Sequence, residues 1–138
     1  MEQKSRNNLL AAYYILNSPQ KEQVCSVSVH CSYYAVFQYM KYILAHLKRG
    51  AISYDVQDDI CSGDNSHEVI LDKIRDSLTG VNPKKQRDLL EGIRCLKKQR
   101  VSADYTIEPF TLEDCLEIKQ NAEGLISKLK SYFNNKVA

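Results

Sequence analysis

The chain has 138 residues, of which 43% are hydrophobic and 26% are charged. Those proportions are typical of a folded protein and exclude wholesale disorder, and the length predicts one domain over residues 1–138. The formal net charge is only +2, so net charge alone indicates no class of partner. Only five glycines and three prolines are present, which favours helices over an all-β fold rich in turns.

Apolar residues recur at three- and four-residue steps along most of the chain, and no segment alternates with the period of a strand. The pattern predicts five helices, in chain order over 4–16, 19–48, 66–78, 83–100 and 111–133. Polar connections are expected at 51–65, with at most a short turn of helix, and at 102–109. We therefore predict an all-α fold, an up-and-down bundle of four to five helices.

Short capping signals set the expected helix starts. Ser18–Pro19 is predicted to begin the second helix and Asn82–Pro83 the fourth, because proline fits the first helical position. Ser66 is expected to cap the third helix. Thr111 is expected to cap the last one, whose first turn carries acidic residues that the helix dipole favours.

Cysteine usage and hydropathy indicate the compartment. Five cysteines, none in a Cys-x-x-Cys pair, indicate reduced thiols in a cytoplasmic protein. Their spacing predicts no metal site, and the lack of a glycine-rich phosphate loop leaves no cofactor to expect. The longest apolar run, Leu9–Leu16, is too short to cross a bilayer, and residues 1–8 are polar. Neither a membrane span nor a secretory leader is expected.

Charge is segregated along the chain. Residues 51–76 carry seven acidic side chains and two basic ones, whereas residues 84–100 carry seven basic and two acidic ones. A basic helix face can follow the phosphates of RNA, but such a face can also be merely solvated or paired with the acidic block. Arg94, Lys97 and Lys98 are the candidate RNA-binding residues of the basic block.

Arg100 continues the apolar stripe of the fourth predicted helix, so its side chain is expected to leave the helix on the face that packs against the core. A buried arginine needs a partner, and Asp104 is the nearest one in sequence. The pair is interpreted either as a structural tie or as part of a phosphate-binding pocket. His30 and His67 are the candidate proton-transfer groups of that pocket, and with Arg100 they are the catalytic candidates if the protein is an enzyme.

An aromatic cluster follows His30 on the second predicted helix, comprising Tyr33, Tyr34, Phe37, Tyr39 and Tyr42. Such residues can fill the core, with their hydroxyls bonded at its edge, or stack on the bases of single-stranded nucleic acid. Tyr34 is the candidate for nucleotide contact because it shares a helix face with His30.

Three segments together resemble the HEPN superfamily, the helical "higher eukaryotes and prokaryotes nucleotide-binding" domains, and most closely its small stand-alone bacterial members. They are Ser32–Phe37, with its Tyr-Tyr-Ala-x-Phe pattern, His67–Ile70, and Arg100–Tyr105, with its Arg-x-x-Ala-Asp-Tyr pattern. Their order and spacing extend the resemblance over nearly the whole chain. The resemblance implies a helical bundle that often dimerises, in prokaryotic toxin–antitoxin, phage-defence or nucleotidyltransferase-partner systems.

Ribonucleases of this superfamily carry an arginine followed closely by a histidine, and no arginine stands shortly before any of the three histidines here. The resemblance therefore implies a non-catalytic homodimer that binds a nucleotide, RNA or a nucleotidyltransferase partner. Two alternatives remain open at this point. One is a metal-independent endoribonuclease with a displaced Arg/His site, and the other is a helical protein–protein interaction module.

Overall fold

A computed structural model describes residues 1–63, 65–107 and 109–138; Asp64, in the acidic block, and Glu108, in the predicted 102–109 loop, lie outside the described residues. The described residues form six helices: α1 (Glu2–Leu16), α2 (Lys21–Ala45), α3 (Tyr54–Ile60), α4 (Ser66–Asp76), α5 (Pro83–Tyr105) and α6 (Leu112–Phe133). Within the described ranges the only β-type contact is an isolated bridge between Leu47 and Val137. The prediction of an all-helical chain is confirmed.

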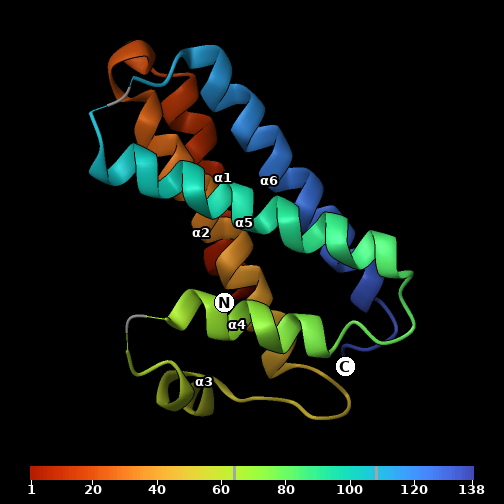
Figure 1. Cartoon of the computed structure of the whole chain (residues 1–138). Coiled ribbons are helices and arrows are strands. Elements are labelled where there is room, and N and C mark those ends of the chain that lie inside the picture. Colours follow the sequence, from red (N-terminus) through yellow and green to blue (C-terminus); the bar gives the residue numbers. More distant parts are fainter. Residues whose placement is uncertain (64, 108) are drawn as a thin grey trace.

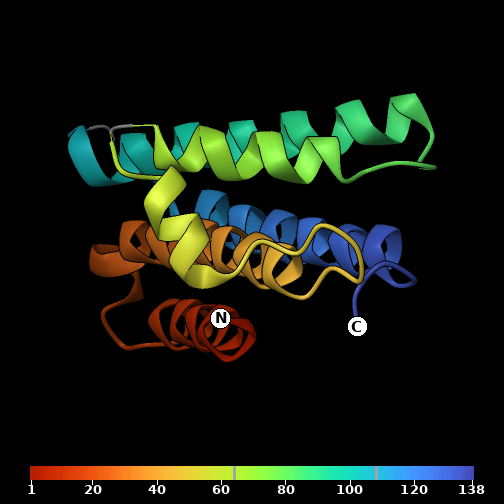
Figure 2. The same ribbon diagram turned by 90° about the horizontal axis from the view of Figure 1, so that it is seen from below.

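The helices lie in three layers, which Figure 2 shows edge-on. α1 covers one face of the layer formed by α2 and α6, and α4 and α5 lie across the other face (Figures 1 and 2). α2 is the central element and contacts every other helix. α1 and α2 form an antiparallel hairpin, whereas α5 crosses α2 obliquely (Figure 1).

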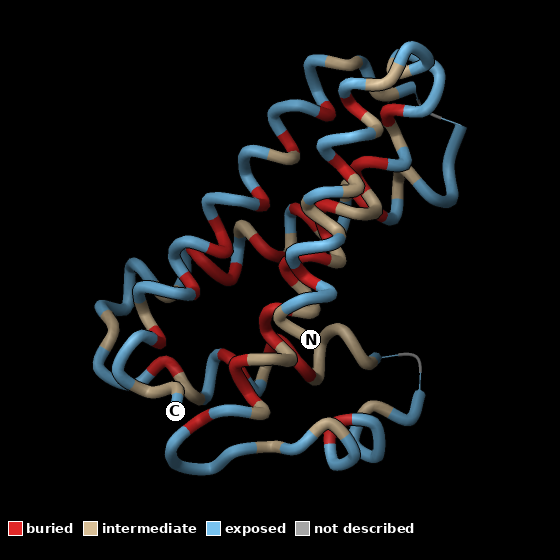
Figure 3. Tube along the Cα trace, turned by 180° about the vertical axis from the view of Figure 1, so that it is seen from behind, coloured by how far each residue is buried: buried red, intermediate tan, exposed pale blue. Residues whose placement is uncertain are grey.

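The position of α2 in the middle layer explains why its buried residues are not confined to one stripe. Helices pack on two of its sides, so neighbouring positions such as Tyr33, Ala35 and Val36 are all buried. Figure 3 shows buried positions concentrated where the helices face one another. Val24 and Val27, in the first turns of α2, are 36% and 51% exposed.

Two of the predicted helix starts are confirmed in detail. The Asn82 side chain accepts a hydrogen bond from the Lys84 amide at 2.8 Å, with proline in the first turn. Thr111 Oγ1 accepts from the Asp114 amide at 3.0 Å, and the Asp114 carboxylate accepts from the Thr111 amide at 3.1 Å. This reciprocal arrangement satisfies two otherwise unpaired donors at the start of α6.

The predictions for Ser18 and Ser66 as caps are wrong. α2 begins at Lys21, whose amide donates to the Ser18 carbonyl at 3.1 Å. Residues 17–20 form the turn between the antiparallel α1 and α2, and the helix starts only after this turn. Ser66 lies inside α4, whose cap position is Asn65 and has no side-chain hydrogen bond.

The ends of two helices also differ from the prediction. α2 stops at Ala45 rather than near Lys48, because the Lys48 amide donates to the Lys136 carbonyl at 2.8 Å and the chain leaves the helix to meet the C-terminus. α5 continues to Tyr105, so residues 102–105 are helical and not a loop. Asp104 consequently lies one helical turn after Arg100, on the same face.

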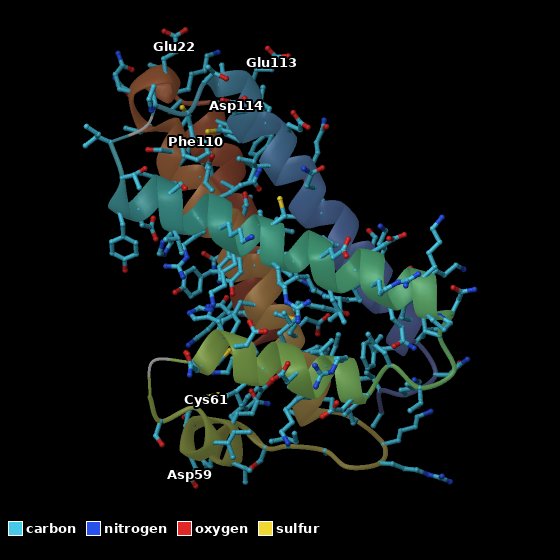
Figure 4. All side chains as sticks on the ribbon, in the orientation of Figure 1. Glu22, Asp59, Cys61, Phe110, Glu113 and Asp114 are labelled. Carbon is cyan, nitrogen blue, oxygen red and sulfur yellow. The ribbon has the colours of Figure 1, made fainter. Side chains whose placement is uncertain are left out.

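The starts of α2 and α6 meet at one end of the molecule. Glu22 lies in the first turn of α2, and Glu113 and Asp114 lie in the first turn of α6. Figure 4 shows these three carboxylates at one end of the molecule and Asp59, at the end of α3, at the other. Negative charge in a first turn complements the helix dipole, so these carboxylates have a structural reason to be there.

No helix of the described chain has both the length and the apolarity to cross a bilayer.

Candidate functional site

Three helices bring the predicted site residues together. The middle turns of α2 supply His30, Tyr33 and Tyr34, the first turn of α4 supplies His67, and the end of α5 supplies Arg100. These helices contact one another pairwise, with α4 and α5 on the same face of α2 (Figure 2). We call the group formed by these five residues together with Phe37 and Asp104 the Arg100 cluster.

Arg100 is the buried centre of the Arg100 cluster. It is only 7% exposed, and its guanidinium carbon lies 5.4 Å from the ring centre of Tyr33 and 5.6 Å from that of Tyr34. Its Nη1 donates to Asp104 Oδ2 at 3.4 Å. Its Nε has no hydrogen-bond partner among the described residues. The guanidinium is held by cation–π contacts and one long ion pair, which leaves donor capacity unused.

Asp104 joins Arg100 to His30. The same carboxylate oxygen lies 2.8 Å from His30 Nδ1, across 74 residues of sequence. A carboxylate only accepts hydrogen bonds, so Nδ1 carries a proton, and in the neutral ring the opposite nitrogen, Nε2, is the acceptor. The His30 side chain is 45% exposed, against 21% for Asp104. This arrangement orients an imidazole toward solvent in the tautomer that a general base needs.

His67 occupies a different environment. Its Nδ1 lies 2.7 Å from the Tyr33 hydroxyl, and its ring centre lies 4.5 Å from that of Phe37. Burial, with the positive charges of Arg100 and Lys97 nearby, lowers the pKa of His67 to about 4. Burial also raises the pKa of Tyr33. Both groups are therefore uncharged near neutral pH. His67 acts there as a hydrogen-bonding group and not as a general acid or base.

The lowered pKa of His67 makes stability depend on pH. Its folded pKa lies below its ordinary value of 6.5, so the unfolded chain binds more protons between the two values. Stability is therefore lost as the pH falls from about 6.5 toward 4. Because the ring is only half-buried, we expect a loss of about 1–2 kcal/mol. Urea unfolding at about pH 7 and about pH 5 measures this loss, and His67→Gln should remove it. An equal acid dependence in both proteins would contradict the assignment.

A groove lies beside the Arg100 cluster, between the start of α4 and the second half of α5. Its volume is about 530 Å³, and its lining residues are Glu68, Arg94, Lys97, Lys98, Val101 and Ser102. We call it the α4–α5 groove. Arg94 Nη2 donates to Glu68 Oε1 at 3.4 Å. This is the one ion pair between the acidic and basic blocks among the described residues, so the two blocks do not simply neutralise each other.

The structure gathers the candidate catalytic and nucleotide-binding residues into the Arg100 cluster and the adjoining groove, whereas Tyr39 and Tyr42 of the aromatic cluster lie outside both. Arg100, Asp104, Tyr34, His30 and His67 lie in the cluster, and Arg94, Lys97 and Lys98 line the groove. The Arg100–Asp104 ion pair expected from the sequence is present. The core interpretation of the aromatic cluster holds for Tyr33 and Tyr39, which are buried, whereas Tyr34 is half-buried.

Sequence reasoning did not single out Tyr33 and Glu68 as site residues. The Tyr33 hydroxyl hydrogen-bonds to His67, and the Arg100 guanidinium lies over the Tyr33 ring. The sequence signals for Tyr33 were its membership of the aromatic cluster and of the Tyr-Tyr-Ala-x-Phe pattern. Glu68 was counted in the acidic block, although its position directly after His67 at a helix start places it on the groove. Lys84, Lys85 and Arg87 belong to the basic block but lie in the first turns of α5, away from the groove.

Another groove of about 530 Å³ lies near the C-terminus, with Lys48, Arg49, Asp76 and Lys136 in its lining. Lys136 there already donates to the carbonyls of Ser77 and Thr79.

Among the described residues, no three His, Cys, Asp or Glu side chains gather closely enough to hold a metal ion. No family model, curated protein or solved structure matches this chain.

Proposed function

We propose that this protein binds single-stranded RNA or a nucleotide in the α4–α5 groove, without catalysis of its own. The observation that carries the proposal is the set of three cations on the groove, Arg94, Lys97 and Lys98. Lys97 and Lys98 make no ion pair among the described residues, so they are free to neutralise phosphates. The groove adjoins the Arg100 cluster, where a buried guanidinium retains unused donor capacity.

The resemblance to the HEPN superfamily extends this proposal. The three segments that carry it supply contacting residues: Arg100 lies over Tyr33, and Tyr33 bonds His67. That proximity supports a HEPN-like domain, and the resemblance in turn suggests a bacterial component of a toxin–antitoxin or defence-type system with a nucleotidyltransferase partner. We further propose a cytoplasmic homodimer, the cytoplasm from the odd number of cysteines and the dimer from the resemblance. Light scattering that finds only monomer at high concentration would overturn the dimer.

The groove is tested with the triple variant Arg94→Ala, Lys97→Ala and Lys98→Ala. Affinity for a labelled single-stranded RNA is expected to fall at least about ten-fold at moderate salt, because three phosphate-neutralising charges are lost. The slope of log affinity against log salt should shrink by about 2, since each contact on single-stranded RNA contributes about 0.7. Fluorescence anisotropy over a range of salt concentrations measures both quantities.

A matched control removes the same charges elsewhere, through Lys48→Ala, Arg49→Ala and Lys128→Ala. These three side chains are exposed and lie outside the α4–α5 groove. The control is expected to bind RNA nearly as well as the unaltered protein. An equal loss in the control would move the site away from the α4–α5 groove. An unaltered protein that binds no RNA or nucleotide would favour the protein–protein interaction module instead.

The second candidate function is a metal-independent endoribonuclease, which the His30–Asp104 pair favours. Asp104 fixes the imidazole so that Nε2 can take the proton of a ribose 2′-hydroxyl. The freed 2′-oxygen would form a bond to phosphorus while the bond to the 5′-oxygen breaks. The leaving oxygen takes a proton from solvent water, and the protonated His30 ring returns its proton to the hydroxide so formed. Arg100, next to the same carboxylate, would stabilise the charge that develops on the phosphate.

A further inference from the structure

We propose that Glu68 makes the α4–α5 groove selective for guanine in single-stranded RNA, which rests on the proposed function of that groove. In this proposal the Glu68 carboxylate recognises the edge of a base, in a site whose other charged residues are cations. A phosphate-binding groove gains nothing from a negative charge, because a carboxylate repels phosphates. Glu68 nevertheless lines this groove together with three cations.

Glu68 lies in the first turn of α4, where the helix dipole favours a carboxylate, but its side-chain pairing is weak. Its ion pair with Arg94 is a single contact at 3.4 Å, and the two side chains are 45% and 42% exposed. Exposed pairs of that kind contribute little to stability. The other carboxylate oxygen, Oε2, has no hydrogen-bond partner among the described residues. The carboxylate can therefore exchange its weak contact for a ligand without a large cost.

The groove also offers a surface against which a base can lie. Val101 is 39% exposed at the groove, and the methylene stems of Lys97 and Lys98 add further apolar surface. The planar guanidinium of Arg94 can stack on a base in the same space. The groove is open to solvent, and its volume of about 530 Å³ leaves room for a base. A base in the groove would thus have its face covered and its edge near Glu68.

Guanine is the base whose edge fits a carboxylate best. Its Watson–Crick edge presents two neighbouring donors, N1–H and the 2-amino group, and a carboxylate presents two acceptor oxygens. Adenine and cytosine present one amino group beside an acceptor nitrogen, and uracil presents one N–H between two carbonyls, so each of these brings an acceptor against the carboxylate. Single-stranded RNA leaves these edges free to be read.

The test uses labelled oligouridines that carry guanine, inosine or adenine at one central position. Inosine retains N1–H but lacks the 2-amino group, so it isolates the second hydrogen bond. We expect the unaltered protein to bind the guanine oligonucleotide about ten-fold more tightly than the adenine one, with inosine between them. Glu68→Gln should bring the three affinities within about two-fold of one another. Fluorescence anisotropy gives all of these affinities.

Asp72→Asn is the matched control for the charge. It removes one negative charge from the same helix, but Asp72 pairs with Arg75 at 3.3 Å and does not line the groove. This variant should keep the guanine preference. Equal binding of all three oligonucleotides by the unaltered protein would overturn the selectivity and leave the RNA-binding function standing. A guanine preference that survives Glu68→Gln would also overturn it. Binding of none of them would remove both proposals.

Discussion

Arg100→Ala is expected to lower the free energy of unfolding by about 2–4 kcal/mol. The substitution removes a buried side chain that lies against the rings of Tyr33 and Tyr34, and it leaves a cavity between α2 and α5. It also removes one partner of the ion pair with Asp104. The loss should stay below that of a fully buried pair, because Asp104 is partly exposed and still bonds His30. Urea unfolding monitored by circular dichroism measures the change.

Arg100→Met separates packing from charge. Methionine fills most of the arginine volume and leaves no buried Nε without a partner, so we expect its stability to lie within about 1 kcal/mol of the unaltered protein. If Arg100 contributes to phosphate binding, this folded variant should still bind RNA more weakly. An Arg100→Met variant as unstable as Arg100→Ala would show that the charge, and not the packing, holds the helices together.

If the protein cleaves RNA, His30→Asn is expected to reduce the rate of cleavage by about 10²–10⁴-fold. The reason is that the Nε2 acceptor which Asp104 orients would be lost. His67→Gln is expected to have a smaller effect, because the pKa of His67 lies too low for efficient proton transfer near neutral pH. A denaturing gel with labelled single-stranded RNA in the presence of a chelator measures the rates.

His46→Asn is the matched control for this assay. His46 is exposed, lies just beyond the end of α2, and bonds the carbonyl of Tyr42 through Nδ1, outside the Arg100 cluster. It should leave any cleavage unchanged. Equal cleavage by all the variants would indicate a contaminating nuclease. Absence of cleavage by the unaltered protein would remove the endoribonuclease candidate and leave RNA binding as the proposed function.

Local signals in the sequence predicted most of the helical architecture. Apolar spacing located the five long helices, since burial of a stripe follows the helical period. Asn82 and Thr111 marked two helix starts correctly, because a cap is satisfied by amides two or three residues away. The start of α2 was mispredicted because the turn at residues 17–20 depends on how α1 packs against α2, which no local pattern encodes.

The sequence by itself thus determined an all-helical chain and a basic segment, and it named Asp104 as the partner of Arg100 while placing it in a loop. The structure extends α5 through Asp104, which puts the two residues one helical turn apart. Only the tertiary structure decided which residues surround that pair. It brought His30 to Asp104 across 74 residues and Tyr33 to His67 across 34. It also placed Glu68 of the acidic block opposite the basic face of α5. Contacts of this kind, and the lowered pKa of His67, depend on which helix faces meet. Helix packing determines which faces contact one another, and the apolar period of a single helix does not reveal those contacts.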